Sequence, residues 1–385
     1  MQSLDAFAHE KLQDRDAHNL RRAIVETVSE DGLVVMRVGR RLLNFCSNDY
    51  LNLSRHPGVK AAAAAAAEQY GAGAGASRLV TGNHPLYSQL ETRLARLKGT
   101  EAACVFGSGY LANIGIIPAL AGDGDLILLD ELAHACMHGG ASMSGATVAT
   151  FAHNNPDDLD ARLRRERKRH RHVLIATEGV FSMDGDVAPL SSLSAVAQAH
   201  DAWLMVDDAH GLGVLGDGRG TAFLGESDPG IPLKMGTLSK ALGSYGGYLC
   251  ASRAVIDLVV NRARSLIYST GLPPAALAAA LASLDLIEAH PALSALPLQK
   301  ARRFTQAAGL PAAQSPIVPI MMGGADTALR ATAMLENEGF LVVAIRPPTV
   351  PQGTARLRAT FTAGHADADI DRLANLVRTR MVRPS

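Results

Sequence analysis

The stretches His172-Val-Leu-Ile-Ala-Thr-Glu178 and Trp203-Leu-Met-Val-Asp-Asp-Ala-His210 decide the fold of this 385-residue chain. Each is an apolar run of strand length that ends in polar side chains, and residues 190–200 between them have the pattern of a helix. Two strands joined by such a helix form a parallel β-α-β unit, with both carboxyl ends at one edge of the sheet. The pattern therefore predicts a ligand site at that edge, beside Asp207 and His210.

Short apolar runs alternate with helical stretches on both sides of this unit. The alternation predicts an α/β fold, with a mostly parallel sheet between layers of helices. The strands expected in this sheet are residues 102–106, 126–129, 147–151, 172–177, 203–206, 233–236 and 247–251.

The chain is expected to form three parts, because its length exceeds that of one ordinary core. Residues 1–45 form an N-terminal arm, with an amphipathic helix over 4–27 and a strand pair. Residues 46–285 form a large domain that binds the ligand. Residues 286–385 form a small α+β domain with strands at 317–321, 341–345 and 356–361. A long alanine-rich helix over 265–286 is expected to lead out of the large domain.

Composition excludes several classes of function. Lys+Arg and Asp+Glu both total 37, so no net charge attracts nucleic acid or an anionic membrane. The four cysteines are scattered without metal-ligand spacing, so neither a metal site nor a disulfide framework is expected. The basic run over residues 162–172 has no interleaved aromatics, which favours a solvated helix end over a nucleic-acid patch. No signal or transit peptide pattern is found, and we expect a soluble, cytoplasmic protein.

The segment Gly236-Thr-Leu-Ser-Lys240-Ala-Leu-Gly243 places a lysine in a glycine-bounded loop after a predicted strand. A partly desolvated lysine has a lowered pKa, and its neutral amine can form an imine with an aldehyde cofactor. Taken alone, the lysine could equally be a snorkelling side chain on a turn. Its companions favour the chemical interpretation.

Asp207 and His210 follow the predicted strand 203–206, where a carboxylate can pair with the protonated pyridine nitrogen of pyridoxal 5′-phosphate (PLP). A helix-capping Asp with a structural His is the alternative. Ser182 adds a hydroxyl after the neighbouring strand. His134 could stack on a flat ring, although a satisfied loop histidine is the default for a single His.

A small-residue turn, Phe106-Gly-Ser-Gly109-Tyr110, connects a predicted strand to a predicted helix. Backbone N–H groups at such a helix start bind phosphate, and Thr237 could add a hydroxyl. The run Gly71–Gly75 suggests a dinucleotide site instead, but it follows a helix and not a strand. Nucleotide binding is therefore disfavoured.

Taken together, these segments resemble the α-oxoamine synthases, a family of fold-type I PLP-dependent enzymes. The resemblance covers nearly the whole chain, through the motifs Phe45–Leu51, Ala76–Asn83, Thr177–Asp186, Val206–Gly211, Thr237–Gly243, Ile267–Thr270 and Ile345–Pro351.

The resemblance implies a role for each matching residue. Lys240 would hold PLP as a Schiff base and move the Cα proton, and Asp207 would pair with the pyridinium. His134 would stack over the ring, and His210 and Ser182 would contact the ring hydroxyl. The phosphate contacts would be Gly109, Tyr110 and Thr237, helped by Ser269 or Thr270 of the partner subunit. The implied substrate contacts are Arg358 at the amino-acid carboxylate, together with Arg21, Asn48, His134 and Thr349.

The sequence of Ile345–Pro351 resembles that of one branch of the family. Enzymes of this branch condense L-alanine with a pimeloyl thioester, carried on CoA or on an acyl carrier protein. This reaction gives 8-amino-7-oxononanoate, CO₂ and free thiol in biotin biosynthesis. We therefore expect a transferase that is a homodimer with shared active sites. The alternatives are a glycine-using relative making 5-aminolevulinate or 2-amino-3-oxobutyrate, a nicotinamide oxidoreductase and a non-catalytic binding protein.

Overall fold

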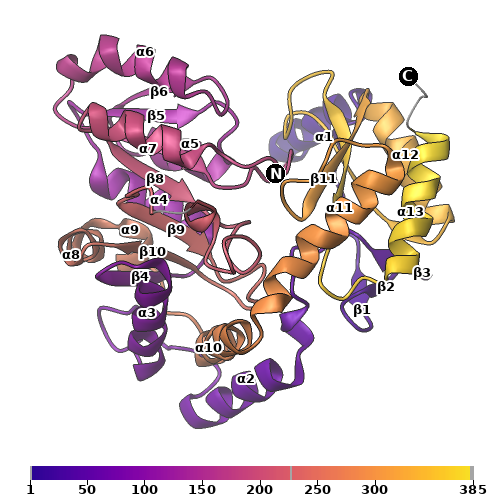
Figure 1. Cartoon of the computed structure of the whole chain (residues 1–385), viewed down its shortest axis with the longest axis horizontal. Coiled ribbons are helices and arrows are strands. Elements are labelled where there is room, and N and C mark those ends of the chain that lie inside the picture. The colour runs from indigo at the N-terminus through magenta and orange to yellow at the C-terminus, as the bar shows by residue number, and fades with distance from the viewer. Residues whose placement is uncertain (1, 226–227, 382–385) are drawn as a thin grey trace. The chain divides into compact units, whose positions relative to one another are not determined.

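The computed structural model describes residues 2–225 and 228–381. Its contacts divide the chain into two compact units, and Figure 1 shows the elements of both. The larger unit is Asn48–Gln299, and the smaller unit combines Met1–Ser47 with Lys300–Ser385.

This division differs from the predicted three parts in two respects. The N-terminal arm shares a unit with the C-terminal segment, because β3 (Arg40–Asn44) pairs in parallel with β12 (Phe340–Leu341). The boundary predicted at residue 286 falls inside helix α10 (Pro274–Ala289), which packs on α2 (Pro57–Tyr70) within the larger unit.

The larger unit is built on a seven-stranded sheet with the order β4-β10-β9-β8-β7-β5-β6. Strands β6, β5, β7, β8 and β9 run parallel, whereas β10 is antiparallel to both of its neighbours. The bounds are β4 (Ala102–Phe106), β5 (Leu126–Asp130), β6 (Thr147–Phe151), β7 (Val173–Glu178), β8 (Trp203–Asp207), β9 (Leu233–Thr237) and β10 (Gly247–Ala251). The predicted α/β fold and all seven predicted strands are confirmed.

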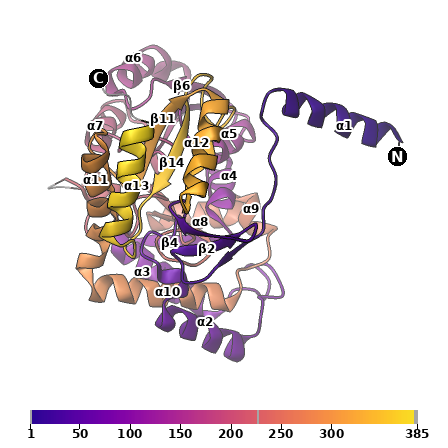
Figure 2. The same cartoon turned by 90° about the vertical axis from the view of Figure 1, so that its right-hand side faces the viewer.

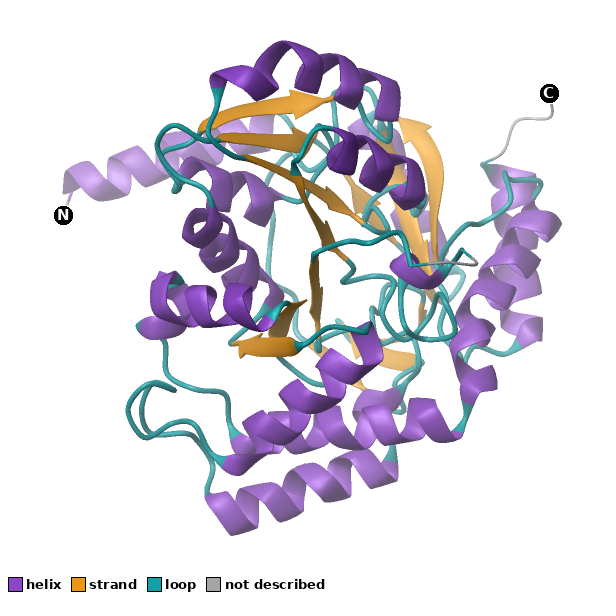
Figure 3. Cartoon of the chain, turned by 60° about the vertical axis from the view of Figure 1, so that its left-hand side comes forward, coloured by secondary structure: helices purple, strands orange, loops and turns teal. Residues whose placement is uncertain are grey.

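Six strands of this sheet are buried on both faces, as the near-continuous apolar runs predicted, whereas the edge strand β6 is mostly exposed. On β5, Leu126 and Leu128 pack with helices on one face, α6 (Pro156–Glu166) and α7 (Leu190–Ala199). Ile127 and Leu129 pack on the opposite face with α4 (Gly109–Leu120), α5 (Ala135–Ser142), α8 (Arg253–Arg262) and α9 (Arg264–Ile267). Side chains of a strand alternate between faces, so one apolar run supplies two cores. Figure 3 shows helices on both sides of the strands.

Helices and short 3₁₀ turns (η) connect the strands of the larger unit. Their bounds are η1 (Leu53–Arg55), α2, α3 (Pro85–Lys98), α4 (Gly109–Leu120), α5 (Ala135–Ser142), α6 (Pro156–Glu166), η2 (Arg167–Arg169), α7 (Leu190–Ala199), η3 (Thr221–Phe223), α8 (Arg253–Arg262), α9 (Arg264–Ile267), α10 and η4 (Pro291–Ala295). The basic run of residues 162–172 falls at the end of α6 and on η2, where Arg162 and Arg164 pair with aspartates one turn earlier.

The smaller unit contains two sheets. The first has the order β1-β2-β3-β12, and the second has the order β11-β14-β13. The bounds of the remaining elements are α1 (Gln2–Ala17), β1 (Thr27–Ser29), β2 (Val34–Arg37), α11 (Leu296–Ala308), β11 (Ile317–Gly323), α12 (Ala325–Asn337), β13 (Val343–Ile345), β14 (Ala355–Thr360) and α13 (Asp367–Arg380).

Three predicted elements differ from the structure. The helix predicted over 4–27 ends at Ala17, and an extended segment continues to β1 (Figure 2). The helix predicted over 265–286 is interrupted between α9 and α10, where prolines start a new helix at Pro274. The strand predicted over 341–345 is split into β12 and β13, which belong to different sheets.

Within residues 2–225 and 228–381, no single helix has the length and apolar composition needed to cross a membrane. The bent pair Pro274–Ala289 and Pro291–Ala308 meets that test only when its two helices are taken together.

Candidate active site

The carboxyl ends of the parallel strands in the larger unit open into a pocket of about 240 Å³. Its lining comes from β8, β9 and the starts of α4 and α5, as predicted for an open α/β sheet. The lining residues are Ser108, Gly109, Tyr110, His134, Cys136, Glu178, Asp207, Ala209, His210, Thr237, Ser239 and Lys240. Seven residues that the sequence predicted for a cofactor site are therefore brought together: Gly109, Tyr110, His134, Asp207, His210, Thr237 and Lys240.

The Lys240 amine is held by a short chain of hydrogen bonds. Its Nζ lies 2.8 Å from Nε2 of His210, whose Nδ1 lies 2.6 Å from the Tyr50 hydroxyl. That hydroxyl donates to Oδ1 of Asn48 at 3.3 Å. A neutral His210 protonated on Nδ1 satisfies all three contacts, because Nε2 then accepts a hydrogen bond from the lysine. These hydrogen bonds hold the Lys240 amine at the pocket, in the loop that follows β9.

The loop that bears Lys240 turns sharply at Gly243. Gly243 has a φ of +59°, and a Cβ atom there would lie 2.2 Å from the backbone nitrogen of Ser54. A larger residue is therefore excluded by both the backbone conformation and the space.

Asp207 ends β8 and is almost fully buried. Its Oδ1 accepts the Ala209 backbone N–H at 3.0 Å, and its Oδ2 accepts the side-chain amide of Asn113 at 2.7 Å. Glu178 ends the neighbouring strand β7, and burial, reinforced by the charge of Asp207, raises its pKa well above the usual value. Two carboxyl groups therefore lie at one pocket, and the raised pKa of Glu178 favours its neutral form.

Helix α4 points its N-terminus at the pocket. Ser108 caps the helix by accepting the backbone N–H of Leu111, and the N–H groups of Gly109 and Tyr110 have no acceptor within the helix. A Cβ atom on Gly109 would lie 3.4 Å from Thr237, so the glycine keeps this turn close to the Thr237 hydroxyl. The arrangement forms an anion site.

His134 caps the neighbouring helix α5. Its Nδ1 accepts the backbone N–H of Cys136 at 3.2 Å and lies 2.8 Å from Sγ of the same residue. Burial lowers the pKa of His134, although the charge of Asp207 opposes this shift. The neutral form of the ring is therefore favoured, with Nδ1 as acceptor and the proton on Nε2.

Residues 40–377 match the family described as aminotransferase class I and II. The chain belongs to this family. A relative called 8-amino-7-oxononanoate synthase, from Methylocella silvestris, is 63% identical over 89% of this chain and 98% of its own. A serine palmitoyltransferase from Sphingomonas wittichii superposes with a TM-score of 0.91 at 29% identity, covering 98% of this chain and 96% of that one. A structure of SPT with its PLP internal aldimine has a TM-score of 0.87 at 30% identity, covering 98% and 97%.

The class I and II aminotransferases are fold-type I enzymes that depend on PLP, and the chemistry of the pocket fits this cofactor. Lys240 offers an amine to the aldehyde and Asp207 a buried carboxylate to the ring nitrogen. The start of α4 offers N–H groups to the phosphate.

Among the described residues, three predicted contacts do not line this pocket. Ser182 lies behind Glu178, whose carboxylate accepts its backbone N–H. Asn48 is connected to Lys240 through the hydrogen bonds of Tyr50 and His210. Thr270 forms an isolated β-bridge with Ser77 and has an exposed side chain.

The remaining predicted contacts belong to the smaller unit. Arg358 is buried on β14, and Thr349 follows β13. Arg21 was predicted to lie on the N-terminal helix, but it lies beyond the helix end and pairs with Asp16 at 2.7 Å. Its neighbour Arg22 donates to the Thr349 hydroxyl at 2.9 Å.

Sequence reasoning did not assign roles to Tyr50, Asn113 and Cys136, all of which contact predicted site residues. Tyr50 lies in the motif Phe45–Leu51, and Asn113 lies in the first turns of the helix whose start was predicted to bind phosphate. These two positions were the features of the sequence that could have indicated a role in the site. Cys136 follows His134 by two residues but has no motif of its own.

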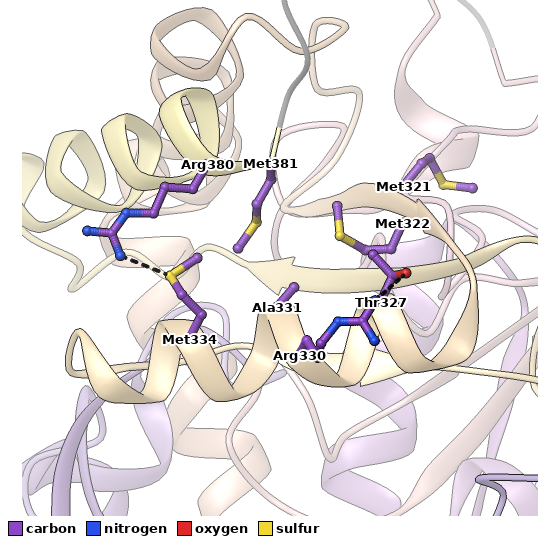
Figure 4. Close-up of a pocket in the computed structure, with 8 residues that line it drawn as sticks. All are labelled: Met321, Met322, Thr327, Arg330, Ala331, Met334, Arg380 and Met381. Atoms are coloured by element: carbon purple, nitrogen blue, oxygen red, sulfur yellow. Dashed lines mark hydrogen bonds between the residues drawn. The ribbon is translucent and has the colours of Figure 1, made fainter.

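A second cavity, of about 640 Å³, lies in the smaller unit, and Figure 4 shows the eight residues that line it. Four are methionines, and its two arginines pair with Asp326 and Glu338. These eight residues offer thioethers, guanidinium groups and one hydroxyl, but neither a lysine nor a carboxylate. This cavity therefore does not match the chemistry of the family.

Proposed function

We propose that this protein condenses L-alanine with a pimeloyl thioester to give 8-amino-7-oxononanoate, CO₂ and the free thiol. In this reaction the alanine Cα bonds to the acyl carbon, the C–S bond breaks, and the Cα–carboxylate bond breaks to release CO₂. The observation that carries the proposal is the pocket holding Lys240 and Asp207, in a chain 63% identical to a relative named for this product.

When bound, PLP supplies an aldehyde and a protonated ring that accepts electrons from Cα. The Lys240 amine then serves as the base that removes the Cα proton and later returns it. Asp207 would supply a negative charge to the ring nitrogen, and His134 would contact the ring. The α4 N-terminus and Thr237 anchor the phosphate, which orients the substrate toward Lys240.

The substrate contacts rest on the family resemblance. Arg358 is assigned to the amino-acid carboxylate, where its guanidinium can form a bidentate pair. Arg21 and Thr349 are assigned to the acyl group, and Asn48 is assigned to the substrate side of the site. Ser182 is assigned, with His210, to the ring hydroxyl.

We also assign a homodimer in which Thr270 completes the phosphate site of the partner subunit. The exposed apolar side chains of Leu79, Val80 and Tyr268 flank the bridge between Ser77 and Thr270. A patch of this kind is typical of a protein interface. The balanced charge and the free cysteines support a cytoplasmic location.

The test is thiol release by the purified, PLP-loaded protein with alanine, glycine or serine against pimeloyl-, acetyl-, succinyl- and palmitoyl-CoA. Alanine with pimeloyl-CoA should give the highest kcat/KM. Since one methyl group changes binding by about 1–3 kcal/mol, alanine should exceed glycine by roughly 10- to 200-fold. A higher kcat/KM for glycine with acetyl- or succinyl-CoA, or for serine with palmitoyl-CoA, would overturn the substrate assignment.

A further inference from the structure

Asn113 is a fully buried amide between two residues of the pocket. Its Nδ2 donates to Oδ2 of Asp207 at 2.7 Å and to Sγ of Cys136 at 3.0 Å. Its Oδ1 is buried and has no hydrogen-bond partner among the described residues. Both N–H groups of this amide are therefore used, whereas its carbonyl is not.

The charge of Asp207 decides which way this amide points. A flipped amide would place Oδ1 against the carboxylate, which is repulsive and loses a charge-assisted hydrogen bond. The orientation seen leaves Oδ1 buried without a hydrogen-bond partner in the described part of the chain, which is unfavourable by itself. A leucine would fill a similar volume without leaving a buried oxygen unsatisfied. We therefore attribute the role of Asn113 to its two N–H hydrogen bonds.

Cys136 connects the same amide to His134. Burial raises the pKa of the Cys136 thiol to about 12, so the sulfur carries its proton at neutral pH. The thiol can then donate to Nδ1 of His134, which it shares with the Cys136 backbone N–H, while Sγ accepts from Asn113. The hydrogen bonds run in one direction, from the amide through the sulfur to the imidazole.

We propose that Asn113 is a positioning residue that holds the Asp207 carboxylate beneath the ring nitrogen of PLP, and that Cys136 extends its hold to His134. The inference rests on the proposed function of the pocket. It assigns no direct contact with the cofactor to either residue. One buried hydrogen-bond network thereby positions both side chains proposed to contact the ring, Asp207 and His134.

The test is the substitution Asn113→Leu, which keeps the volume and removes the donors. PLP affinity, measured by fluorescence titration of the apo-protein, should fall by about 10- to 100-fold, the value of a hydrogen bond to a charged group. In the holoenzyme, kcat should fall by a similar factor, with KM for alanine changed by less than about threefold. Cys136→Ala should weaken PLP binding less, and Cys136→Ser should recover most of that loss, because a hydroxyl makes both contacts.

Ser194→Ala is the matched control. Ser194 is also buried and donates at 2.6 Å to the Pro229 carbonyl, away from the pocket. This variant should lose thermal stability without losing PLP affinity. Wild-type affinity and kcat in Asn113→Leu would overturn the inference, as would a loss fully matched by a fall in apo-protein melting temperature. A wild-type protein that binds no PLP would instead overturn the proposed function.

Discussion

At the scale of single residues, the account depends on a buried carboxylate at the end of β8. Asp207 is hydrogen-bonded at both oxygens, by Ala209 and Asn113, and it faces the Lys240 amine across the same pocket. The remaining lone pairs can accept the N–H of a protonated pyridine ring. In the proposed function, the electron-accepting power of the cofactor would depend on the charge of this one side chain.

The substitution Asp207→Asn removes this charge and keeps the shape. We expect kcat to fall by about 10²- to 10³-fold, as for loss of one electrostatic contact in an active site. The far-ultraviolet circular dichroism spectrum and the melting temperature should stay close to wild type. Wild-type turnover in the variant would mean that another group pairs with the ring.

His153, outside the pocket, gives a prediction about pH. Its two ring nitrogens lie 2.9 Å from Asp130 and 2.8 Å from Asp186. Burial alone would lower the pKa of His153, but the two carboxylates outweigh it and raise the pKa to about 10. The folded-state pKa exceeds the unfolded value of about 6.5, so the stabilisation is complete below pH ~6.5 and is lost as the pH rises through ~10.

The free energy of unfolding of wild type and of His153→Gln should therefore differ more at pH 6 than at pH 10.5. Urea unfolding at both pH values measures this difference. An equal difference at the two pH values would show that the ion pairs of His153 do not contribute. Arg162→Gln, which removes a partly buried ion pair on α6, serves as the control because arginine stays charged over this range.

Single residues also show how far the sequence can be interpreted. Lys240, Asp207 and His210 were predictable because strand ends and a glycine-bounded loop mark them in the chain itself. Asn113 and Cys136 were not, because their roles depend on packing between α4, α5 and β8. The contact between Asn113 and Asp207 joins residues 94 positions apart, which no local pattern reveals.

At the scale of elements, strands were easier to predict than the N-terminal helix. The strands are marked by apolar runs buried on both faces, whereas the side chains of α1 that the structure describes are all exposed. The pattern of apolar residues over 4–27 predicted a helix but not its end, because tertiary packing stabilises most helices and the described side chains of α1 are exposed. It ends at Ala17, and Asn19 has a left-handed φ of 55°.

The segment after α1 is fastened to the loop after β13. Arg22 donates to Thr349, and Arg346 donates to the Asn19 carbonyl. We propose Arg21 as an acyl contact, so Arg21→Ala should raise KM for pimeloyl-CoA more than KM for alanine. Arg22→Ala removes the hydrogen bond to Thr349 and tests whether this contact affects the same KM values. Steady-state kinetics with each substrate varied measures both, and an equal rise in the two KM values for Arg21→Ala would contradict the assignment.

At the scale of the whole molecule, the α/β class and the sheet followed from the sequence, but the composition of the two units did not. The pairing of β3 with β12 joins segments almost 300 residues apart, and strands of two residues leave little trace in the sequence. The homodimer is a proposal that rests on the family resemblance and on the exposed apolar residues near Thr270, which are Leu79, Val80 and Tyr268.

A homodimer should have twice the 40.4 kDa mass of one chain by light scattering. Tyr268→Asp places a charge in the exposed apolar patch and should shift the protein toward monomer. PLP affinity should fall with it, because the partner subunit's Thr270 would leave the phosphate site. Full turnover by a wild-type monomer would contradict the shared site.

The central claim, that Lys240 holds PLP, is tested most directly by reducing the loaded protein with sodium borohydride and mapping its peptides by mass spectrometry. The chain has seven lysines, and Lys98 and Lys234 are buried in ion pairs elsewhere, so their peptides serve as internal controls. The account predicts a phosphopyridoxyl adduct on Lys240 alone, and none at that position in Lys240→Ala. An adduct on another lysine, or no adduct in wild type, would contradict it.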